Sequence, residues 1–415
     1  MSEEKLVPKL RFSGFDDEWK KSNLGNISSN EMYGMNSAAK DYDGFNKYIR
    51  ITDISETSNK FIPNPLTSPD GDLEDKYKLK KGDIVFARTG ASTGKTYLYD
   101  DNDRNLYFAG FLIKFHIDNA DPKFIFYNTL KEEYLNWVSV MSVRSGQPGI
   151  NSNEYKKLPI ILPSLDEQNK ISNFLTSIDK KIDLLERKHQ FYQEFKKFLM
   201  QQIFTQKLRF NFDDEWKQYK LKDVLTVKSS SISINQLEEN TGDYPLYGAS
   251  GFLKNINFCE MDVDYISIVK DGSGVGNLSF HEKNSSIVNT SQYLLPKKNF
   301  NINFLYYLLQ TINLMKYVNG SSIPHIYFKD YCIEKINIPS LDEQEKIGKL
   351  FVDVDITMEN LNKNINATQE FKKGLLQQMF VVRINWRCNF KLAKSPSFNK
   401  HLLILKNKII FIIIK

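Results

Sequence analysis

The sequence contains few of the residues that build disulfide frameworks or metal sites. Three cysteines and five histidines occur in 415 residues, and Cys259, Cys332 and Cys388 lie far apart. This spacing is typical of neither a disulfide framework nor a zinc site, and it fits a reducing compartment. The charged N-terminus, MSEEKLVPKL, has no apolar core of the kind that a secretory signal requires. We therefore expect a cytoplasmic protein with no metal site.

The motifs of DNA-modifying enzymes are also missing. The sequence has neither Asp-Pro-Pro-Tyr nor Asn-Pro-Pro-Tyr, the tetrapeptides expected of an adenine amino-methyltransferase. No glycine-rich loop for S-adenosylmethionine and no Asp…Glu-x-Lys nuclease centre stands out. A catalytic triad is disfavoured because histidines are so few. We therefore expect no catalytic residues in this chain, and no cofactor bound by it.

The positive charge of the chain is concentrated at its end. From Val381 onward there are eight Lys or Arg and no acidic residue, which leaves 48 basic and 50 acidic residues in 1–380. Nucleic-acid binding must therefore be argued from local patches, because the net charge of +6 does not describe the body of the chain. The tail ends in LLILKNKIIFIIIK, which is shorter than the roughly 20 apolar residues that span a bilayer. We interpret 381–415 as an atypical extension rather than a membrane or nucleic-acid anchor.

An internal repeat organises everything before that tail. KLRFSGFDDEW at 9–19 returns as KLRFNFDDEW at 207–216. LPSLDEQNKI at 162–171 returns as IPSLDEQEKI at 338–347, and EFKKFLMQQIF at 194–204 returns as EFKKGLLQQMF at 370–380. The last two pairs share one offset of 176 positions, so the stretch between them is repeated without a gap. A period of this length predicts two copies of a domain followed by a helix, and not a solenoid.

Each copy ends in a phrase that is typical of a long helix. Ser164-Leu-Asp-Glu167 and Ser340-Leu-Asp-Glu343 each predict a capping box, in which the serine accepts from first-turn amides and the glutamate reaches back. Apolar residues then recur at spacings of three and four over about 40 residues, or about 60 Å of helix. One stripe cannot be buried alone, so we expect the two helices to pair as an antiparallel coiled coil. The predicted packing positions are Ile171, Phe174, Ile178, Leu185, Ile347, Leu350, Val354 and Leu361.

The regions before the helices mix strand and helix patterns. Residues 47–54, 82–90 and 263–272 alternate as strands do, whereas 124–138 and 302–318 are typical of helices. The predicted fold is therefore mixed α/β, with two tandem globules separated by two long helices. The predicted boundaries are 1–160 for the first globule, 161–206 for the first helix, 207–336 for the second globule, 337–380 for the second helix and 381–415 for the tail.

One glycine-rich loop in each copy is a candidate contact surface. Arg88-Thr-Gly-Ala-Ser-Thr-Gly-Lys-Thr96 resembles a phosphate-binding loop but is one residue short between its glycines. The second copy keeps the glycines in Lys270-Asp-Gly-Ser-Gly-Val-Gly276 and loses the Gly-Lys-Thr, so a function shared by both copies is favoured over ATP binding. A plain glycine turn between strands is the alternative interpretation. The candidate phosphate or base contacts are Arg88, Thr89, Ser92, Thr93, Lys95, Lys270, Ser273 and Asn277.

A second polar loop precedes each long helix. Residues 144–150 read RSGQPGI and residues 319–326 read NGSSIPHI. Arginine and glutamine can make bidentate contacts to guanine and adenine, and serine and histidine can contact base edges more weakly. Such loops also serve as plain connections. The candidates here are Arg144, Gln147, Ser321, Ser322 and His325.

These phrases together resemble the specificity subunits of Type I restriction–modification systems. The resemblance rests on the paired LPSLDEQ and IPSLDEQ helix starts, KLRF…FDDEW, YIRITDI, GDIVFARTGASTGKT and YPLYGASGF, and it covers residues 8–380. It implies that each globule is a target-recognition domain for one half of a bipartite site in double-stranded DNA. It also implies that the helices set the gap between the halves and dock two methyltransferase subunits. Because the two globules differ, an asymmetric site is expected.

The resemblance also assigns the chemistry to partners. Methyltransferase subunits would bind S-adenosylmethionine and methylate adenine N6, and motor–nuclease subunits would use ATP and Mg to cleave unmodified DNA. Two alternatives stay open from the residues alone. One is a self-contained methyltransferase–nuclease, which the missing motifs disfavour; the other is a coiled-coil scaffold whose globules bind proteins.

Overall fold

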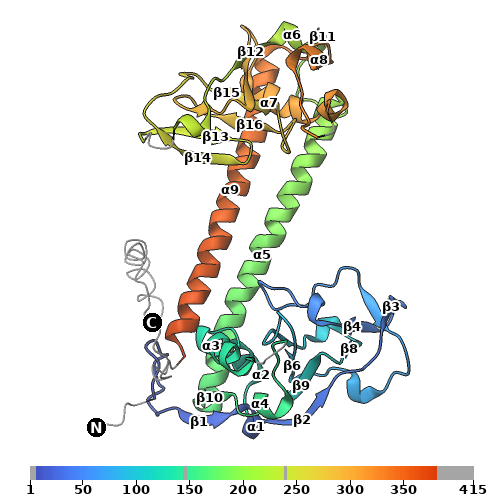
Figure 1. Cartoon of the computed structure of the whole chain (residues 1–415), viewed down its shortest axis with the longest axis vertical. Coiled ribbons are helices and arrows are strands. Elements are labelled where there is room, and N and C mark those ends of the chain that lie inside the picture. The colour runs from blue at the N-terminus through green and yellow to red at the C-terminus, as the bar shows by residue number, and fades with distance from the viewer. Residues whose placement is uncertain (1–5, 144–146, 238–240, 321, 381–415) are drawn as a thin grey trace. The chain divides into compact units, whose positions relative to one another are not determined.

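The computed structural model describes residues 6–143, 147–237, 241–320 and 322–380, and the chain divides into two units. Unit 1 comprises Met1–Asp183 with Asn366–Lys415, and unit 2 is the continuous segment Leu184–Ile365. Each unit is a mixed α/β globule together with parts of both long helices, α5 (Leu165–Phe204) and α9 (Leu341–Gln378) (Figure 1). The predicted tail, 381–415, lies outside the described residues.

The globule of unit 1 is built mainly from short antiparallel strands. One sheet has the order β2-β9-β6-β7, and the pairs β1-β10, β3-β5 and β4-β8 form smaller sheets. The elements are β1 (Lys20–Asn23), α1 (Leu24–Ile27), β2 (Ser28–Tyr33), β3 (Ala39–Asp41), β4 (Lys47–Ile49), η1 (Ile51–Asp53), β5 (Thr67–Pro69), η2 (Asp75–Tyr77), β6 (Asp83–Ala87), β7 (Thr96–Leu98), η3 (Asp101–Asp103), β8 (Leu106–Phe108), β9 (Leu112–Ile117), α2 (Pro122–Asn128), α3 (Glu132–Met141), α4 (Ser152–Tyr155) and β10 (Pro159–Leu162).

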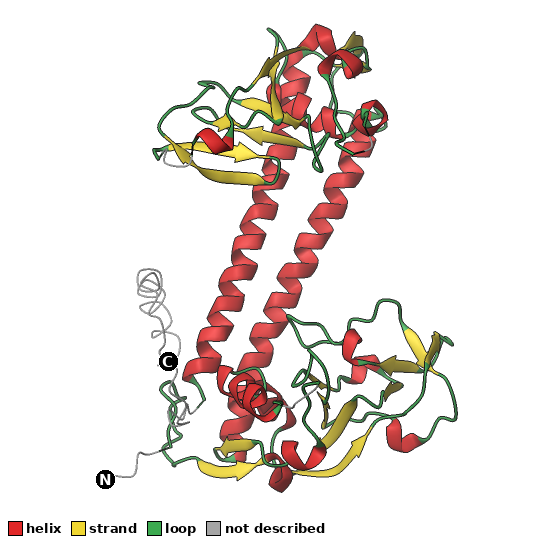
Figure 2. Ribbon diagram, viewed as in Figure 1, coloured by secondary structure: helices red, strands yellow, loops and turns green. Residues whose placement is uncertain are grey.

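The globule of unit 2 repeats this topology. Its main sheet has the order β12-β18-β15-β16, its β11-β19 pair corresponds to β1-β10, and a third sheet has the order β14-β13-β17. The elements are β11 (Lys217–Lys220), α6 (Leu221–Val224), β12 (Leu225–Ser229), η4 (Ile234–Gln236), β13 (Tyr244–Gly248), β14 (Gly251–Ile256), β15 (Tyr265–Val269), β16 (Leu278–His281), β17 (Ser286–Ile287), β18 (Ser291–Pro296), α7 (Ile302–Gln310), η5 (Leu314–Tyr317), α8 (Phe328–Tyr331) and β19 (Lys335–Ile338). Figure 2 shows the strands of each globule in yellow and the long helices in red.

One inner strand of each main sheet, β6 or β15, is buried along its whole length. In β6, Ile84 and Phe86 belong to the main core of unit 1, whereas the alternate residues Val85 and Ala87 belong to a second cluster beneath β4 and β8. Successive side chains of a strand point to opposite faces, so one strand can join two cores. The strand predicted within 82–90 is confirmed as β6, but all five of its residues are buried, so the expected alternation of buried and exposed residues is absent.

Two predicted helices are each split by a threonine. The segment 124–138 becomes α2 and α3, and 302–318 becomes α7 followed by the 3₁₀ helix η5. The Thr129 hydroxyl donates to the Phe126 carbonyl, and the Thr311 hydroxyl donates to the Leu308 carbonyl, both at 2.7 Å. Such local bonds compete with continued helix. The predicted strand at 47–54 is also shorter than expected, because β4 ends at Ile49 and η1 follows.

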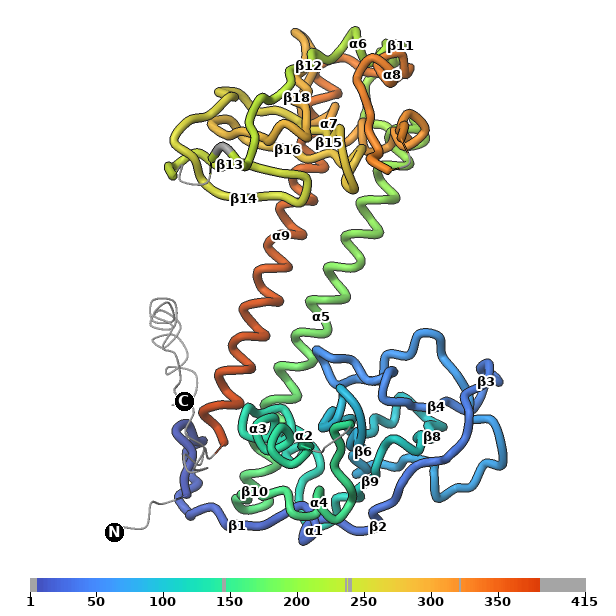
Figure 3. Tube along the Cα trace, viewed as in Figure 1, coloured from blue at the N-terminus to red at the C-terminus, as the bar shows by residue number. Residues whose placement is uncertain are grey.

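Within each unit the two long helices run antiparallel. In unit 2, the Lys196 Nζ lies 2.7 Å from an Asp355 oxygen. Eight residues further along α5 and four residues back along α9, the Phe204 ring stacks on Phe351 with centroids 5.9 Å apart. In unit 1, the Lys372 Nζ lies 2.6 Å from an Asp179 oxygen. Lys196 and Lys372 are repeat equivalents, and so are Asp355 and Asp179, so the same ion pair joins the helices in both units. Figure 3 traces the backbone of α5 and α9.

Each globule core is completed by the end of the other repeat's helix. Phe380, from the second repeat, is 1% exposed in unit 1 and stacks on Phe124 with centroids 5.0 Å apart, beside Trp19. Its repeat equivalent Phe204 packs in unit 2 against Phe304, with centroids 5.7 Å apart. The prediction before the tail was of four segments, two globules and two helices. The contacts instead divide the chain into two units, and each long helix contributes to both of them.

The predicted packing positions fall mainly in these cores. Ile171 and Ile178 belong to the main core of unit 1, Ile347 belongs to that of unit 2, and Val354 and Leu361 are also buried. The remaining three are partly buried, namely Phe174, Leu185 and Leu350. The helix stripes thus cover the globules as well as the facing helix.

The glutamate of each predicted capping box has a different partner from the one expected. Glu167 accepts from Arg11 Nε and Nη2, both at 2.8 Å, and Glu343 accepts from Arg209 in the same way at 2.9 and 2.8 Å. Ser164 accepts from the Glu167 amide at 3.4 Å, but the buried Ser340 hydroxyl has no hydrogen-bond partner within the described part of the chain. The prediction is therefore wrong for the glutamate of both boxes, because the arginine of each KLRF phrase takes the carboxylate, and it is also wrong for the serine of the second box.

Candidate nucleic-acid interface

The first glycine-rich loop is a tight turn between β6 and β7. The Gly94 amide donates to the Ala87 carbonyl at 2.9 Å, and the Thr93 hydroxyl donates to the Gly90 carbonyl at 2.7 Å. Gly94 has a φ of +90°, and a Cβ there would lie 2.5 Å from Val138. Glycine is therefore required by both backbone conformation and packing. The turn holds Thr89 and Ser92 half-buried at the surface of unit 1.

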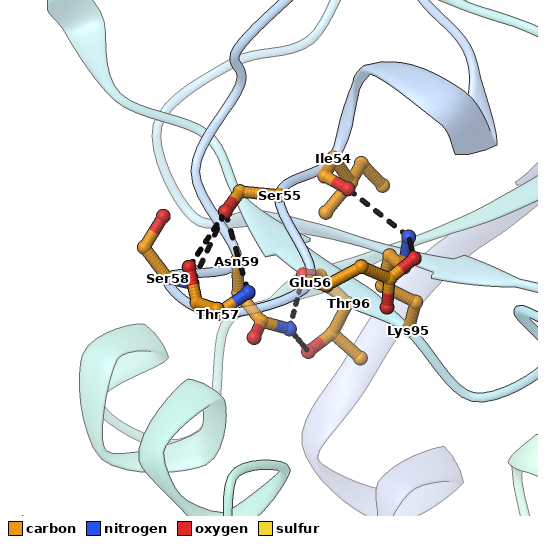
Figure 4. Close-up of polar contacts among 8 residues, drawn as sticks. All are labelled: Ile54, Ser55, Glu56, Thr57, Ser58, Asn59, Lys95 and Thr96. Carbon is orange, nitrogen blue, oxygen red and sulfur yellow. Dashed lines mark hydrogen bonds and ion pairs between the residues drawn. The ribbon is translucent and has the colours of Figure 1, made fainter. Parts of the chain in front are cut away.

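Lys95, at the end of this turn, is engaged inside the globule. Its Nζ donates to the Ile54 carbonyl at 3.1 Å and pairs with Glu56, and its side chain is 9% exposed (Figure 4). The neighbouring Asn59 donates to Thr96, so the 54–59 loop is fastened to the start of β7 (Figure 4). Lys95 therefore anchors the 54–59 loop, and the Glu56 carboxylate compensates its charge.

The second polar loop of unit 1 packs onto the first. The Gly90 amide donates to the Pro148 carbonyl at 3.0 Å, and the Ile150 amide donates to the Arg88 carbonyl at 2.9 Å. A Cβ on Gly90 would lie 3.1 Å from Gln147 Nε2, so the Gln147 amide rests against the turn. The structure thus brings Gln147 and the Arg88 turn together. Arg144 lies outside the described residues.

An open pocket of about 930 Å³ lies beside these two loops. Of the predicted residues, Arg88, Thr89 and Gln147 line it. We name it the Arg88 pocket, and its wall also includes Tyr33, Asn36, Ser37, Tyr48, Arg50, Thr52 and Phe111. Hydrogen-bonding and aromatic side chains therefore face one cavity, which suits contacts to the edges and faces of bases.

Sequence reasoning missed most of this wall. Tyr33 ends β2, Arg50 precedes η1, and Phe111 lies in the turn between β8 and β9. Arg50 donates to both oxygens of Asp53, at 2.9 and 2.8 Å, and this hydrogen bonding raises the pKa of Arg50 above its ordinary value. The phrase YIRITDI carried one signal, an arginine three residues before an aspartate, but we interpreted the phrase as strand and as part of the family resemblance, and not as a site.

Unit 2 contains the equivalent pair of loops. The turn between β15 and β16 places Gly276 at a φ of +84°, with its amide donating to the Val269 carbonyl at 2.8 Å. The Gly272 amide donates to the Pro324 carbonyl at 2.9 Å, and the Ile326 amide donates to the Lys270 carbonyl at 2.8 Å. These bonds match those of unit 1 one for one, so both copies build the same two-loop surface.

The candidate side chains of unit 2 differ from those of unit 1. Lys270 Nζ lies 3.8 Å from its neighbour Asp271, and the His325 ring lies 5.0 Å from the Tyr327 ring. Ser322 is exposed, and Ser273 and Asn277 lie on the turn. Ser321 lies outside the described residues. The backbone of the surface is shared between the copies, while the groups that it displays are not.

Across the described ranges, no group of three or more His, Cys, Asp or Glu side chains could hold a metal ion. No helix in the same residues is long and apolar enough to cross a bilayer.

Comparison with curated proteins finds specificity subunits. The chain is 25% identical over 209 residues to the "Type I restriction enzyme MjaVIII specificity subunit" of Methanocaldococcus jannaschii, covering 47% of this chain and 49% of that protein. It is 25% identical over 226 residues to the "Type I restriction enzyme HindI specificity subunit" of Haemophilus influenzae, covering 53% and 47%. The chain thus spans about half the length of these curated relatives.

The fold is also found among solved structures. The S subunit of a Type I restriction–modification system from M. genitalium superimposes with a TM-score of 0.64 at 18% identity, over 90% of this chain and 99% of that one. This likeness concerns the fold.

The family described as "Type I restriction modification DNA specificity domain" matches the chain twice, at residues 16–190 and 213–369. Each match covers one repeat, with its globule, its pair of loops and more than half of its long helix. This chain therefore belongs to the family of Type I restriction–modification DNA specificity subunits.

Proposed function

We propose that the chain reads a bipartite, asymmetric DNA site, with one globule for each half, and directs adenine-N6 methylation and ATP-dependent cleavage by partner subunits. The observation that carries this proposal is the double family match, one specificity domain in each repeat. The two-loop surface recurs in both units with different side chains, which supports recognition of two different half-sites.

The contact chemistry is that of direct readout. Backbone held in tight turns positions a few polar side chains, and such side chains discriminate bases through the donor and acceptor pattern of the major groove. In unit 1 these are Arg88, Thr89 and Gln147, which line one pocket. In unit 2 they are Lys270, Ser273, Asn277, Ser322 and His325. The two sets are the candidate base and phosphate contacts.

The partners supply the reactions in this proposal. Two methyltransferase subunits dock on the long helices, bind S-adenosylmethionine and flip the target adenines out of the duplex. Motor–nuclease subunits bind ATP and Mg and cleave unmodified DNA. This chain itself contributes recognition without catalysis, in the cytoplasm where chromosomal DNA is available.

Two other functions make different predictions. A self-contained methyltransferase–nuclease would methylate DNA when the purified chain is given S-adenosylmethionine alone. A protein-binding coiled-coil scaffold would show no sequence-specific DNA binding even when methyltransferase subunits are present. The family membership favours the recognition function over both.

Methylome sequencing tests the proposal. Cells that express this chain together with its methyltransferase subunits are expected to carry N6-methyladenine at one split, asymmetric motif. Cells that express the methyltransferase subunits alone should lack that pattern. The same pattern in both cultures, or none in either while all proteins are soluble, would contradict the proposed function.

The helices provide a second test, because they act as a spacer in this proposal. Four residues inserted after Asp183 in α5 and four after Ile365 in α9, the two points where the chain passes from one unit to the other, add about 6 Å to each helix. The methylated motif is expected to gain about two base pairs of gap, at about 3.4 Å each, and to keep both half-sites. An unchanged gap with altered half-sites would show that the helices do not set the spacing. An insertion in α5 alone, which breaks the pairing of the helices, serves as the control.

A further inference from the structure

Arg88 is held more rigidly than a surface arginine usually is. Its amide donates to the Phe111 carbonyl at 3.0 Å, its carbonyl accepts from Ile150, and its Nε donates to the Gly110 carbonyl at 3.0 Å. The guanidinium carbon lies 5.0 Å from the centre of the Tyr33 ring and 6.0 Å from that of Phe111. Both the backbone and the plane of the side chain are therefore fixed before any ligand arrives.

The Tyr33 ring, on one side of Arg88, is itself held in place. The Tyr33 hydroxyl accepts from the Ser152 amide at 3.2 Å. Behind Tyr33, a Cβ on Gly34 would lie 2.2 Å from the Ala109 carbonyl oxygen, so only glycine lets β2 approach the 109–111 turn this closely. That approach places Tyr33 and Phe111 against the same guanidinium.

The terminal nitrogens of Arg88 keep their donors available. Throughout the described residues, no hydrogen bond or ion pair engages Nη1 or Nη2 of Arg88, and the group lines the Arg88 pocket. Arg50, the other guanidinium of this pocket, has both its Nε and Nη2 committed to Asp53. Arg88 is thus the guanidinium of the pocket that can engage a ligand without breaking an ion pair.

We propose that Arg88 reads one guanine in the half-site recognised by unit 1, with Nη1 and Nη2 donating to guanine O6 and N7. A fixed planar pair of donors matches these two adjacent acceptors, and no other base pair presents both in the major groove. The proposal rests on the proposed function and adds a residue and a base to it. Tyr33 and Phe111 act as positioning residues.

Unit 2 lacks this device. The position that corresponds to Arg88 is Lys270, whose single ammonium lies 3.8 Å from Asp271. An ammonium has no planar pair of donors, and a neighbouring carboxylate competes for it. The guanine contact assigned to Arg88 therefore has no counterpart of the same geometry in unit 2.

The experiment uses the complex of this chain with its methyltransferase subunits, after the wild-type motif has been read from the methylome. Each guanine of the motif is replaced in turn by 7-deazaguanine, which lacks the N7 acceptor. At one guanine, in one half-site, wild-type complex is expected to lose affinity about 10- to 100-fold. The Arg88→Ala complex is expected to bind normal DNA that much more weakly and to show no further loss with 7-deazaguanine at this position.

Three further variants sharpen the interpretation. Arg88→Lys keeps the charge and should still lose the guanine dependence. Lys270→Ala, the matched change in unit 2, should leave the dependence on this guanine intact. Lys123→Ala removes an exposed positive charge from unit 1 and controls for uniform electrostatic loss. Should Arg88→Ala fail to fold, Phe111→Ala removes a 60% exposed ring and should weaken the same guanine contact.

Several outcomes would overturn the inference. Equal 7-deazaguanine losses in wild type and Arg88→Ala would exclude a contact to N7. Uniform weakening of Arg88→Ala on all sequences would assign Arg88 to a phosphate, as would a motif without guanine in either half. In each of these cases the wild-type complex still selects a split motif. A wild-type complex that selects no motif would instead overturn the proposed function, and the role of Arg88 with it.

Discussion

Replacing Phe380 with alanine is expected to destabilise unit 1 by about 3–5 kcal/mol while leaving unit 2 close to wild type. Phe380 belongs to the second repeat, yet its ring is 1% exposed inside unit 1, stacked on Phe124 and edge-on to Trp19. Removing it leaves a cavity among large aromatic rings that cannot collapse easily. Hydrogen exchange followed by mass spectrometry would report the loss of protection separately in each unit.

The matched variant is Phe204→Ala, which makes the same change in the same phrase of the first repeat. Phe204 packs on Phe304 and Phe351 in unit 2. Its loss should therefore lower protection in unit 2 and spare unit 1, the reverse of Phe380→Ala. If each variant instead destabilised the globule of its own repeat, the exchange of helix ends between the cores would be wrong.

Replacing Arg11 with alanine is expected to lower the free energy of unfolding of unit 1 by about 3 kcal/mol, as when one partner of a buried ion pair is removed. The Glu167 side chain is 1% exposed, and both of its oxygens accept from Arg11. Without the guanidinium, a carboxylate stays buried at the start of α5 with no countercharge. Denaturant unfolding of the variant, followed by a signal from unit 1, measures the loss.

A second substitution separates charge from packing. In the Arg11→Ala/Glu167→Gln double variant the buried group is a neutral amide, which costs less to leave without an ionic partner. The double variant is expected to recover more than half of the lost stability. A double variant as unstable as Arg11→Ala would show that the arginine stabilises unit 1 through packing alone. Arg209→Ala, the repeat equivalent, should place its effect in unit 2.

Much of the architecture could be predicted because the same sequence phrases occur in both halves of the chain. The paired phrases predicted two globules and two long helices, and the alternation at 82–90 predicted β6. The same duplication hid the exchange of helix ends. Phe204 and Phe380 stand in one repeated phrase, so the sequence offers no means of deciding which globule each ring completes. The predicted antiparallel pairing is compatible with this exchange, but the contacts of Phe380 with Phe124 and of Phe204 with Phe304 are what assign each ring to a core.

The turns of the candidate site could be predicted from the sequence, but most of the side chains that line the Arg88 pocket could not. Glycines with positive φ and a shared loop pattern identified the turns at Arg88 and Lys270. Tyr33 and Phe111 are single aromatic residues 55 and 23 positions from Arg88 in the chain, with no spacing that relates them to it. Lys95 shows the opposite case, because a lysine in a phosphate-type loop was a natural candidate and it is bound to Ile54 and Glu56 instead.

The two units differ in the point during translation at which all residues of their cores have been synthesised. Unit 2 is one continuous stretch, Leu184–Ile365, so all of its parts have been made once residue 365 emerges. Unit 1 begins at the N-terminus but needs the segment that starts at Asn366, including Phe380, to fill its core. The core of unit 1 lacks Phe380 until nearly two hundred further residues have been translated. Contacts of such long sequence separation are also slow to form. The usual N-terminal-first order of domain folding is thereby reversed. The half of the chain that is made first is the last to become complete.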